Sequence, residues 1–221
     1  MIVTIDGPAG AGKSTVTRLL AEQLGFEFLD TGAMYRAVTW AALARGIELT
    51  DAAALADLAQ SMEVKFDGEQ VFVDGRDVTS EIRHPNVTRH VVSIADAVAV
   101  RMHLVELQRQ LANTGNFVCE GRDQGTVAFP DAFCKIYLTA SSRYRAQRRV
   151  EQLESVGAFV DYDQIIREQN LRDQQDRDRP VGRLQKASDA IEFNTDDKSI
   201  EEVVSELLAI VRAKLKRNSV P

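Results

Sequence analysis

The sequence predicts an α/β fold in which a five-stranded parallel sheet lies between helices. Two observations predict it: short apolar segments alternate with helical patterns along most of the chain, and a glycine-rich turn joins the first apolar segment to the first helix. Such short apolar segments are typical of parallel strands, which helices cover on both faces. A chain of 221 residues is long enough for one domain with a smaller inserted lobe.

The alternation places each element in order. The first strand is expected at residues 1–5, and the apolar residues of the helix after the turn share one face, up to Gly25. A second strand at 26–29 leads through Asp30 into a helix at about 33–45. The other three strands and a closing helix are expected at 116–119, 135–138, 190–193 and about 199–216.

Two regions interrupt the alternation. Residues 63–83 alternate polar and apolar side chains around two Asp-Gly turns, which predicts a small antiparallel β insertion. Residues 141–183 are helical and polar, with nine arginines and no lysine. We expect two arginine-bearing helices here, joined by the glycine-containing connection VGAFVDY, that form a hinged lid.

The composition disfavours several classes of protein. A net charge of −6 disfavours nonspecific nucleic-acid binding, and no apolar run is long enough to span a membrane. The start MIVTIDGPAG lacks the features of a secretory signal, so we expect a cytoplasmic protein. Cys119 and Cys134 form no disulfide framework, and His84, His90 and His103 lack the spacing of zinc ligands.

Residues 7–14, GPAGAGKS, match the P-loop pattern G-x-x-x-x-G-K-[ST] between a buried strand and a helix. Glycines let backbone N–H groups point at phosphate oxygens, and the helix N-terminus adds its positive dipole end. Lys13 can then bridge the terminal phosphates, and Ser14 can hold Mg²⁺. The predicted ATP-binding residues are Gly7, Pro8, Ala9, Gly10, Ala11, Gly12, Lys13, Ser14 and Thr15.

A P-loop leaves three classes open: a small-molecule kinase, a GTPase switch, and an ATP-driven motor or regulator. Residues 194–197, NTDD, do not supply the N-K-x-D motif that a switch needs to read guanine. A small-molecule kinase needs a second anion site and a way to exclude water, since transfer to water is the competing reaction.

In each predicted lid helix, arginines share one face. Arginine binds phosphate oxygens bidentately and stays charged, so it suits phosphoryl transfer. The alternative is a pair of solvated helices with ordinary salt bridges. The two sets that share a face are Arg145, Arg148 and Arg149, and Arg172, Asp176 and Arg179.

The stretch DTGAMYRA, residues 30–37, follows the second strand at the sheet edge where parallel sheets gather ligands. Arg36 can reach an acceptor phosphate there. The alternative is that Thr31 caps a helix that carries a surface arginine.

Two Gly-Arg-Asp sequences are separated by their place in the alternation. Arg76 and Asp77 follow a turn in the β insertion, where turn geometry alone explains them. Arg122 and Asp123 follow the third strand and emerge at the same edge as the P-loop. An aspartate there can accept from the exocyclic amine of a base, which suits cytosine better than uracil.

At these motifs the sequence resembles the bacterial-type cytidylate kinases, in the nucleoside monophosphate kinase group. The matching stretches are IDGPAGAGKST, LDTGAMYRA, EGRDQGTVAFPDA, RAQRR and RDQQDRDR…ASDA, in the family's order from residue 5 to residue 190. The P-loop is shared by many enzymes, whereas TGAMYR together with GRDxGTVxFPDA is specific to this family.

The resemblance implies transfer of the ATP γ-phosphoryl group to CMP or dCMP, with Mg²⁺. It implies one P-loop kinase domain over residues 1–221, with a core (1–31, 86–140 and 188–221), a monophosphate-binding lobe with the β insertion (about 32–85) and a lid (about 141–187). We expect a monomer that binds neither nucleic acid nor membranes. A kinase for another monophosphate such as UMP, and a nucleotide-binding regulator with slow ATPase activity, remain alternatives.

The resemblance also implies roles position by position. Thr31 and Asp123 would contact the base with Arg122 beside it, and Arg36 and Arg101 would hold the acceptor phosphate. Asp176 and Arg179 would bind sugar hydroxyls or phosphate. The transferring phosphoryl group would be served by Lys13, Arg145, Arg148 and Arg149.

Overall fold

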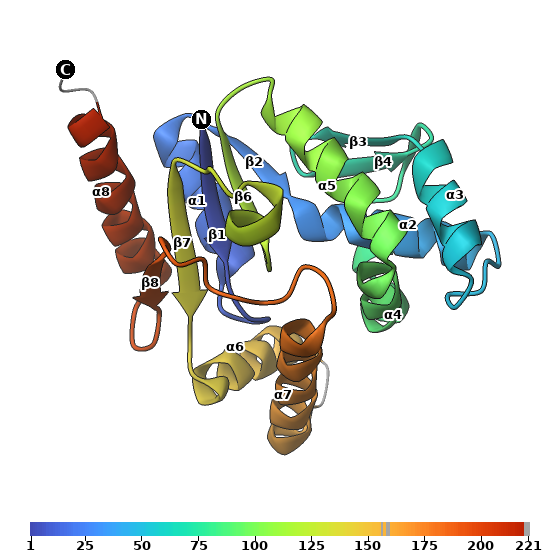
Figure 1. Cartoon of the computed structure of the whole chain (residues 1–221). Helices are drawn as coiled ribbons and strands as arrows, with labels where there is room; N and C mark the ends of the chain where they lie inside the picture. Colours follow the sequence, from blue (N-terminus) through green and yellow to red (C-terminus); the bar gives the residue numbers. More distant parts are fainter. Residues whose placement is uncertain (156, 158–159, 219–221) are drawn as a thin grey trace. The chain divides into compact units, whose positions relative to one another are not determined.

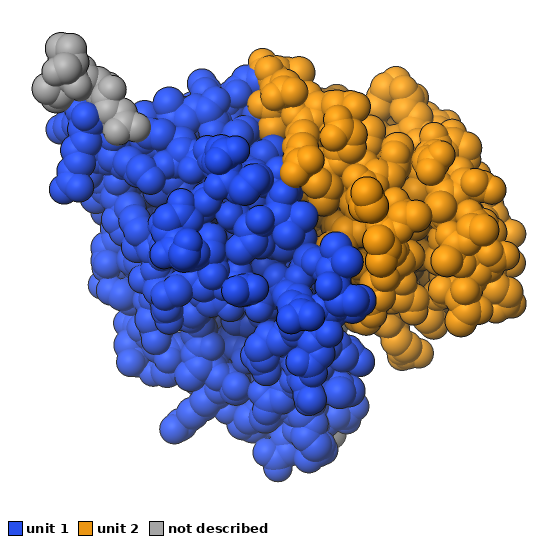
Figure 2. All heavy atoms as spheres, in the orientation of Figure 1, with its two compact units in different colours: residues 1–29, 115–221 blue, residues 30–114 orange. Residues whose placement is uncertain are grey.

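A computed structural model of the chain describes residues 1–155, 157 and 160–218 (Figure 1). Residues 156, 158 and 159 belong to the predicted connection VGAFVDY, which therefore lies partly outside the described residues. The chain divides into two compact units (Figure 2). Unit 1 comprises Met1–Leu29 and Gly115–Pro221, and unit 2 comprises Asp30–Thr114.

Unit 1 is built on the five-stranded sheet that the sequence predicts. The strand order is β2-β6-β1-β7-β8, and β1 pairs in parallel with both β6 and β7 (Figure 1). Each strand begins and ends within two residues of its predicted segment, so the predicted α/β fold is confirmed. The strands are β1 Ile2–Asp6, β2 Glu27–Asp30, β6 Phe117–Gly121, β7 Cys134–Thr139 and β8 Ile191–Asn194.

The described helices of unit 1 include two that pack on the sheet and two in the arginine-rich segment. Apolar residues of α1 and α8, such as Leu20 and Leu207, join Ile5 and Ile136 of the strands in one buried cluster. Helices α6 and α7 contact each other. The bounds are α1 Lys13–Leu24, α6 Ser142–Glu154, α7 Tyr162–Asp178 and α8 Ile200–Asn218, with a short π-helix η2 at Gln124–Ala128.

The register of the sheet brings three strand ends to one edge. Asp6, the last residue of β1, lies opposite Gly121 of β6 and Tyr137 of β7. Because the strands are parallel, the P-loop after β1 and the Gly-Arg-Asp sequence after β6 start from the same edge. This is the arrangement that the sequence alternation predicts.

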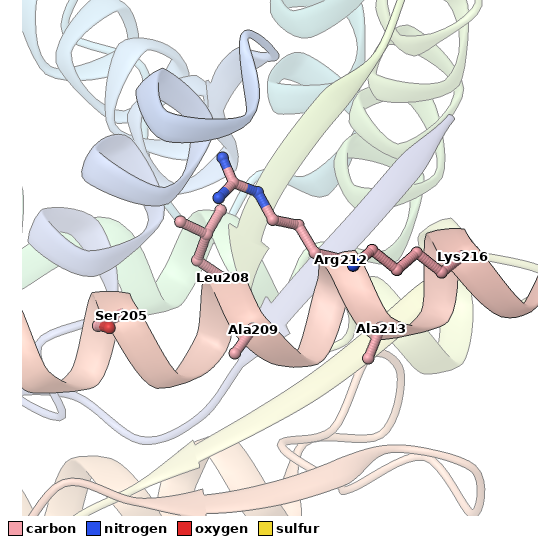
Figure 3. A pocket seen from close by; sticks show the side chains of 6 residues that line it. All are labelled: Ser205, Leu208, Ala209, Arg212, Ala213 and Lys216. Carbon is pink, nitrogen blue, oxygen red and sulfur yellow. The ribbon is translucent and has the colours of Figure 1, made fainter.

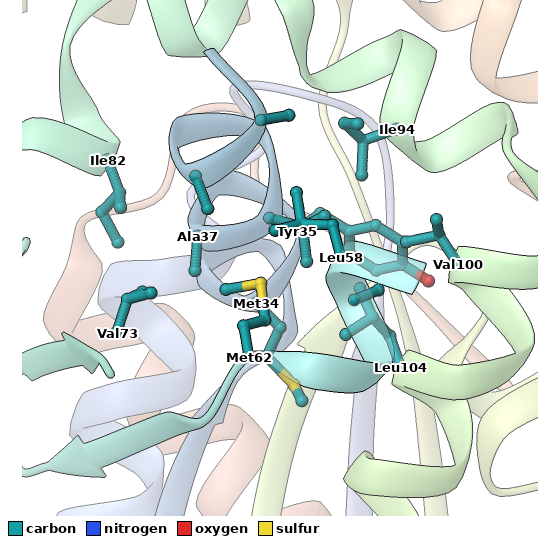
Figure 4. Packing of buried hydrophobic residues seen from close by; sticks show 14 of the residues in the cluster. Met34, Tyr35, Ala37, Leu58, Met62, Val73, Ile82, Ile94, Val100 and Leu104 are labelled. Carbon is teal, nitrogen blue, oxygen red and sulfur yellow. The ribbon is translucent and has the colours of Figure 1, made fainter. Parts of the chain in front are cut away.

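Unit 2 has a core of its own. Helix α2 carries Met34 and Tyr35 into a cluster with Leu58, Ile94 and side chains of the small sheet (Figure 4). The predicted β insertion is an antiparallel sheet of three strands, because Arg76–Asp77 forms a third strand beside β4. The elements are α2 Thr31–Ala44, α3 Ala52–Ser61, β3 Val64–Asp67, β4 Gln70–Val73, β5 Arg76–Asp77, the 3₁₀ helix η1 Glu81–Arg83, α4 Pro85–Asp96 and α5 Val98–Ala112.

Helices α4 and α5 fall in unit 2. The predicted division into a core (1–31, 86–140 and 188–221), a monophosphate-binding lobe and a lid stays a prediction. Within the described part of the chain, no helix has both the length and the apolar character to cross a membrane.

Candidate active site

The P-loop runs from the end of β1 to the start of α1. A Cβ atom on Gly7 would lie 2.1 Å from the carbonyl oxygen of Leu138, so the loop passes too close to β7 for any side chain there. Gly12, with φ 86°, is in the left-handed region and forms the N-cap of α1. The loop therefore delivers the helix N-terminus to the edge of the sheet, as an anion site requires.

Lys13 is buried at the start of α1. Its Nζ donates to the carbonyl oxygen of Pro8 over 2.8 Å, which folds the side chain back over the loop. Burial lowers the pKa of Lys13 to about 7, an effect that Arg122 adds to and Glu120 opposes. A bound phosphate would restore the charge of the ammonium group, because an adjacent anion favours the protonated form.

Ser14 and Glu120 form an oxygen pair beside the P-loop. The Ser14 hydroxyl donates to Oε1 of Glu120 over 2.6 Å, and Glu120 is a buried residue of β6. A hydroxyl and a carboxylate are hard oxygen donors of the kind that Mg²⁺ prefers near phosphates. The pair fits the Mg²⁺ that the P-loop implies, and Ser14 is its predicted member.

Asp6 anchors the segment after β6. Its two carboxylate oxygens accept from the backbone N–H groups of Gln124 and Gly125 over 2.8 and 2.7 Å. Burial raises the pKa of Asp6 to about 6, although these two hydrogen bonds lower it. The last residue of β1 thus fixes the backbone directly after Arg122 and Asp123.

Arg122, Asp176 and Arg179 form a chain of charged hydrogen bonds. Nε of Arg122 donates to Oδ2 of Asp176 over 2.7 Å, and Arg179 donates to Oδ1 over 2.9 Å. Burial alone would raise the pKa of Asp176, but the charges of Arg122 and Arg179 hold it below its ordinary value. Asp123 next to this chain is buried. The structure thus joins the second Gly-Arg-Asp sequence to the end of α7, 54 residues later.

The first Gly-Arg-Asp sequence lies in a different setting. Asp74 and Gly75 form the turn with φ 50° and 79°, and both Arg76 and Asp77 are exposed in β5. Asp77 accepts from the backbone N–H and hydroxyl of Thr79, which lower its pKa. These hydrogen bonds of Asp77 stabilise the local turn and strand.

One of the three arginines predicted on α6 hydrogen-bonds to the P-loop, and a second lies close to it. Nη1 of Arg145 donates to the carbonyl oxygen of Ala9 over 2.8 Å. Arg148 donates to Oγ1 and the carbonyl oxygen of Thr195, after β8, and its Nη1 lies 3.7 Å from a Cβ placed on Gly12. Arg149 is exposed and donates to Gln152 of its own helix, so the structure does not bring it to the P-loop.

The remaining predicted residues lie in unit 2. Arg36 donates through Nη2 to Oδ2 of Asp30 over 2.8 Å, while its Nε is buried with no hydrogen-bond partner in the described structure. Arg101 is buried, donates to the carbonyl oxygen of Ala95 and lies 5.3 Å from the ring of Tyr35. Thr31 is buried at the start of α2, and Asp30 caps this helix by accepting from the Ala33 N–H.

Other features of the described residues supply no second site. No group of three or more His, Cys, Asp or Glu among them is placed to hold a metal. A pocket on α8 is lined by residues of that helix alone, and none of these is a predicted site residue (Figure 3). Cys119 and Cys134 are buried free thiols.

Three residues of the site were not predicted: Asp6, Glu120, and Asp173, whose Oδ2 lies 2.6 Å from Nη2 of Arg145. Asp6 is the last residue of β1 and Glu120 is the last but one of β6, whereas Asp173 is one of many charged residues in α7. Only the first two carried a usable signal, namely an acidic residue at the carboxyl end of a buried strand.

Comparison with known proteins identifies the family. A family profile described as "Cytidylate kinase" matches residues 3–213. A cytidylate kinase of Rhodopirellula baltica is 50% identical over 212 residues, covering 96% of this chain and 93% of that protein. A bifunctional pantoate ligase/cytidylate kinase of Synechococcus elongatus is 48% identical over 229 residues, but this chain covers only 44% of its length.

A solved structure supports the fold. A gluconokinase from Sinorhizobium meliloti 1021 matches with a TM-score of 0.50 at 18% identity, covering 98% of this chain and 93% of that one. At this identity the likeness concerns the fold alone. The profile match and the identity of the relatives show that the chain belongs to the cytidylate kinase family.

Proposed function

We propose that this protein transfers the γ-phosphoryl group of ATP to CMP or dCMP and releases ADP and CDP or dCDP. The observation that carries the proposal is the match to the cytidylate kinase family over residues 3–213, which include the complete P-loop. In the reaction an oxygen of the acceptor phosphate forms a bond to the γ-phosphorus, and the bond from that phosphorus to the β,γ-bridging oxygen breaks. The attacking oxygen is already anionic, so no dedicated base is needed.

The P-loop end of unit 1 would bind ATP. The backbone N–H groups of the P-loop, which every residue but Pro8 carries, would surround the phosphates, and the bound phosphates would favour the protonated form of Lys13. We propose that Ser14 holds Mg²⁺ and that Glu120 assists it, in keeping with their 2.6 Å contact. The ion supplies charge neutralisation at the β- and γ-phosphates when bound.

The acceptor nucleotide would be recognised by its base and its phosphate. We propose that Asp123 and Thr31 read the cytosine, with Arg122 beside them, because a buried carboxylate can accept from the 4-amino group. Arg36 and Arg101 would hold the acceptor phosphate. Asp176 and Arg179 would bind sugar hydroxyls or phosphate, and their bonds to each other and to Arg122 support a pre-formed polar surface.

The lid arginines would stabilise the transferring phosphoryl group. The place of Arg148 beside the segment after β8 supports this role. Arg145 lies at the P-loop, and to serve the phosphoryl group its Nη1 would exchange the carbonyl oxygen of Ala9 for a phosphate oxygen. For Arg149 we propose the same role on its position in the family motif, with a change of side-chain conformation away from Gln152. Helices α6 and α7 would also exclude water, which competes with CMP for the phosphoryl group.

Assembly and location are further proposals. We propose that the protein acts as a monomer in the cytoplasm and binds neither nucleic acid nor membranes, in line with its net charge of −6. Light scattering coupled to size-exclusion chromatography tests the first point. Fractionation of the native cell tests the second.

A substrate panel tests the proposed activity. ADP formation is measured with CMP, dCMP, UMP, AMP, GMP and no acceptor, each with Mg²⁺ and with a chelator. We expect rates well above the no-acceptor blank for CMP and dCMP, and only with Mg²⁺. If UMP alone reacts, the base assignment is wrong, and if every acceptor matches the blank, the protein is a slow ATPase and the proposal fails.

A further inference from the structure

Arg145 ties helix α6 to the P-loop. Its side chain is 4% exposed, and Nη1 donates to the carbonyl oxygen of Ala9 over 2.8 Å. Nε donates to the carbonyl oxygen of Ala140 over 3.2 Å, and Nη2 to the hydroxyl of Ser142 over 3.3 Å. All three guanidinium nitrogens are therefore bonded, and the planar group has a fixed orientation.

Asp173 supplies the countercharge for this buried arginine. It lies on α7, its side chain is also 4% exposed, and its Oδ2 is 2.6 Å from Nη2 of Arg145. Removing one partner of a buried ion pair leaves the other charge uncompensated, which is far costlier than the pair itself. Without the carboxylate of Asp173, the buried charge of Arg145 is uncompensated. This favours movement of the guanidinium group toward water and away from the carbonyl oxygen of Ala9.

Gln169 adds a second link from the same face of α7, one helical turn before Asp173. Its Nε2 donates to the carbonyl oxygen of Arg145 over 3.1 Å. A Cβ atom placed on Gly10 would lie 3.2 Å from this nitrogen and 3.4 Å from the Cβ of Arg145. The P-loop backbone therefore packs directly against Gln169 and Arg145.

We propose that Asp173 is a positioning residue for ATP: through Arg145, it holds the P-loop backbone at Ala9 and Gly10 against α6 and α7. A P-loop binds phosphate with backbone N–H groups, so its affinity depends on where this backbone is held. Gln169 acts in parallel on the same contact. The inference rests on the proposed function only in taking ATP as the P-loop ligand.

The test compares ATP binding with CMP use. We expect Asp173→Asn to raise the Kd for ATP, measured without CMP, by roughly tenfold, since a charged hydrogen bond is lost. The KM for CMP should stay within about twofold, because the change acts on the P-loop. A loss of packing throughout the fold would instead raise both constants together, and that outcome would overturn the proposal.

A double-mutant cycle tests whether Asp173 acts through Arg145. The Arg145→Gln/Asp173→Asn variant should bind ATP no more weakly than Arg145→Gln alone, because the two residues form one unit. Additive losses would contradict this. The double variant leaves no buried unpaired charge, so it keeps the test open if Asp173→Asn does not fold.

Gln169 and Asp178 on the same helix offer a second test and a control. Gln169→Ala introduces no buried charge and should raise the ATP Kd by roughly threefold through its lost hydrogen bond. Asp178→Asn makes the same charge change at an exposed site of α7 and should leave ATP binding unchanged. Unchanged ATP affinity in Asp173→Asn would overturn the inference. Failure of wild-type protein to phosphorylate CMP would refute the proposed function but leave these Kd comparisons valid.

Discussion

Identical residues in this chain differ in chemistry because their burial differs. Asp77 is exposed in β5 and its carboxylate is occupied by Thr79, whereas Asp123 is buried beside the Arg122–Asp176 pair. A carboxylate away from water makes stronger electrostatic interactions, so burial separates a base-reading candidate from a turn residue. In the sequence, the order of the strands alone separates the two aspartates.

This difference predicts opposite results for two matched substitutions. Asp123→Ala should lower kcat/KM for CMP and reduce the preference for CMP over UMP roughly tenfold, as expected for one lost charged hydrogen bond. Asp77→Ala should change neither quantity by more than about twofold, since it is exposed and lies in a surface turn. Steady-state kinetics with both acceptors checks this. Equal effects of the two substitutions would refute the assignment.

At the scale of elements, the ends of the strands could be predicted from the sequence and the contacts between them could not. Periodicity located all five strands within two residues and put the P-loop and Arg122 at one edge. The order β2-β6-β1-β7-β8 did not follow, because apolar strands carry no local mark of their neighbours. The third strand of the small sheet was also missed, because Arg76–Asp77 is only two residues long.

The residues of the candidate site likewise divide into those that the sequence could predict and those that it could not. Residues in motifs, such as Lys13 and Arg122, were found because a spacing along the chain marks them. Asp173 was missed because its partner Arg145 lies 28 residues away, and the pairing of Glu120 with Ser14, 106 residues away, has no mark in the sequence. Pairing over such distances is decided by packing, which a single sequence does not display.

The contact between Asp6 of β1 and the backbone of η2 should make the stability of the protein depend on pH. Its pKa is raised to about 6 by burial, so the folded protein binds a proton more tightly than the unfolded chain does. The contribution of Asp6 to the free energy of unfolding is therefore greatest at low pH and is lost as the pH rises through about 6. We expect the stability advantage of wild type over Asp6→Asn to be about 1 kcal/mol larger at pH 5 than at pH 7.

Urea denaturation of both proteins at each pH measures this difference. Titrating groups that do not interact with Asp6 contribute equally in the two proteins, so they cancel in the comparison. A difference that stays constant, or one that grows toward pH 7, would show that Asp6 does not titrate as described.

At the scale of the whole molecule, the two units have separate cores and separate parts of the proposed chemistry. The unit 1 cluster includes Ile5 and Leu207, and the unit 2 cluster includes Met34 and Ile94. The P-loop belongs to unit 1, whereas Arg36 and Arg101 belong to unit 2. Substitutions in unit 2 should therefore affect the acceptor more than ATP.

Arg36→Ala tests whether a substitution in unit 2 affects the acceptor more than ATP. Arg36 has a buried Nε with no partner among the described residues, so an acceptor phosphate would gain a charged hydrogen bond there. We expect kcat/KM for CMP to fall by roughly 2–4 kcal/mol in transition-state stabilisation, while the Kd for ATP stays within about twofold. Arg45→Ala, which removes an exposed arginine after α2, is the control and should leave CMP use unchanged. If Arg36→Ala weakened ATP and CMP equally, the acceptor role of Arg36 would have to be abandoned.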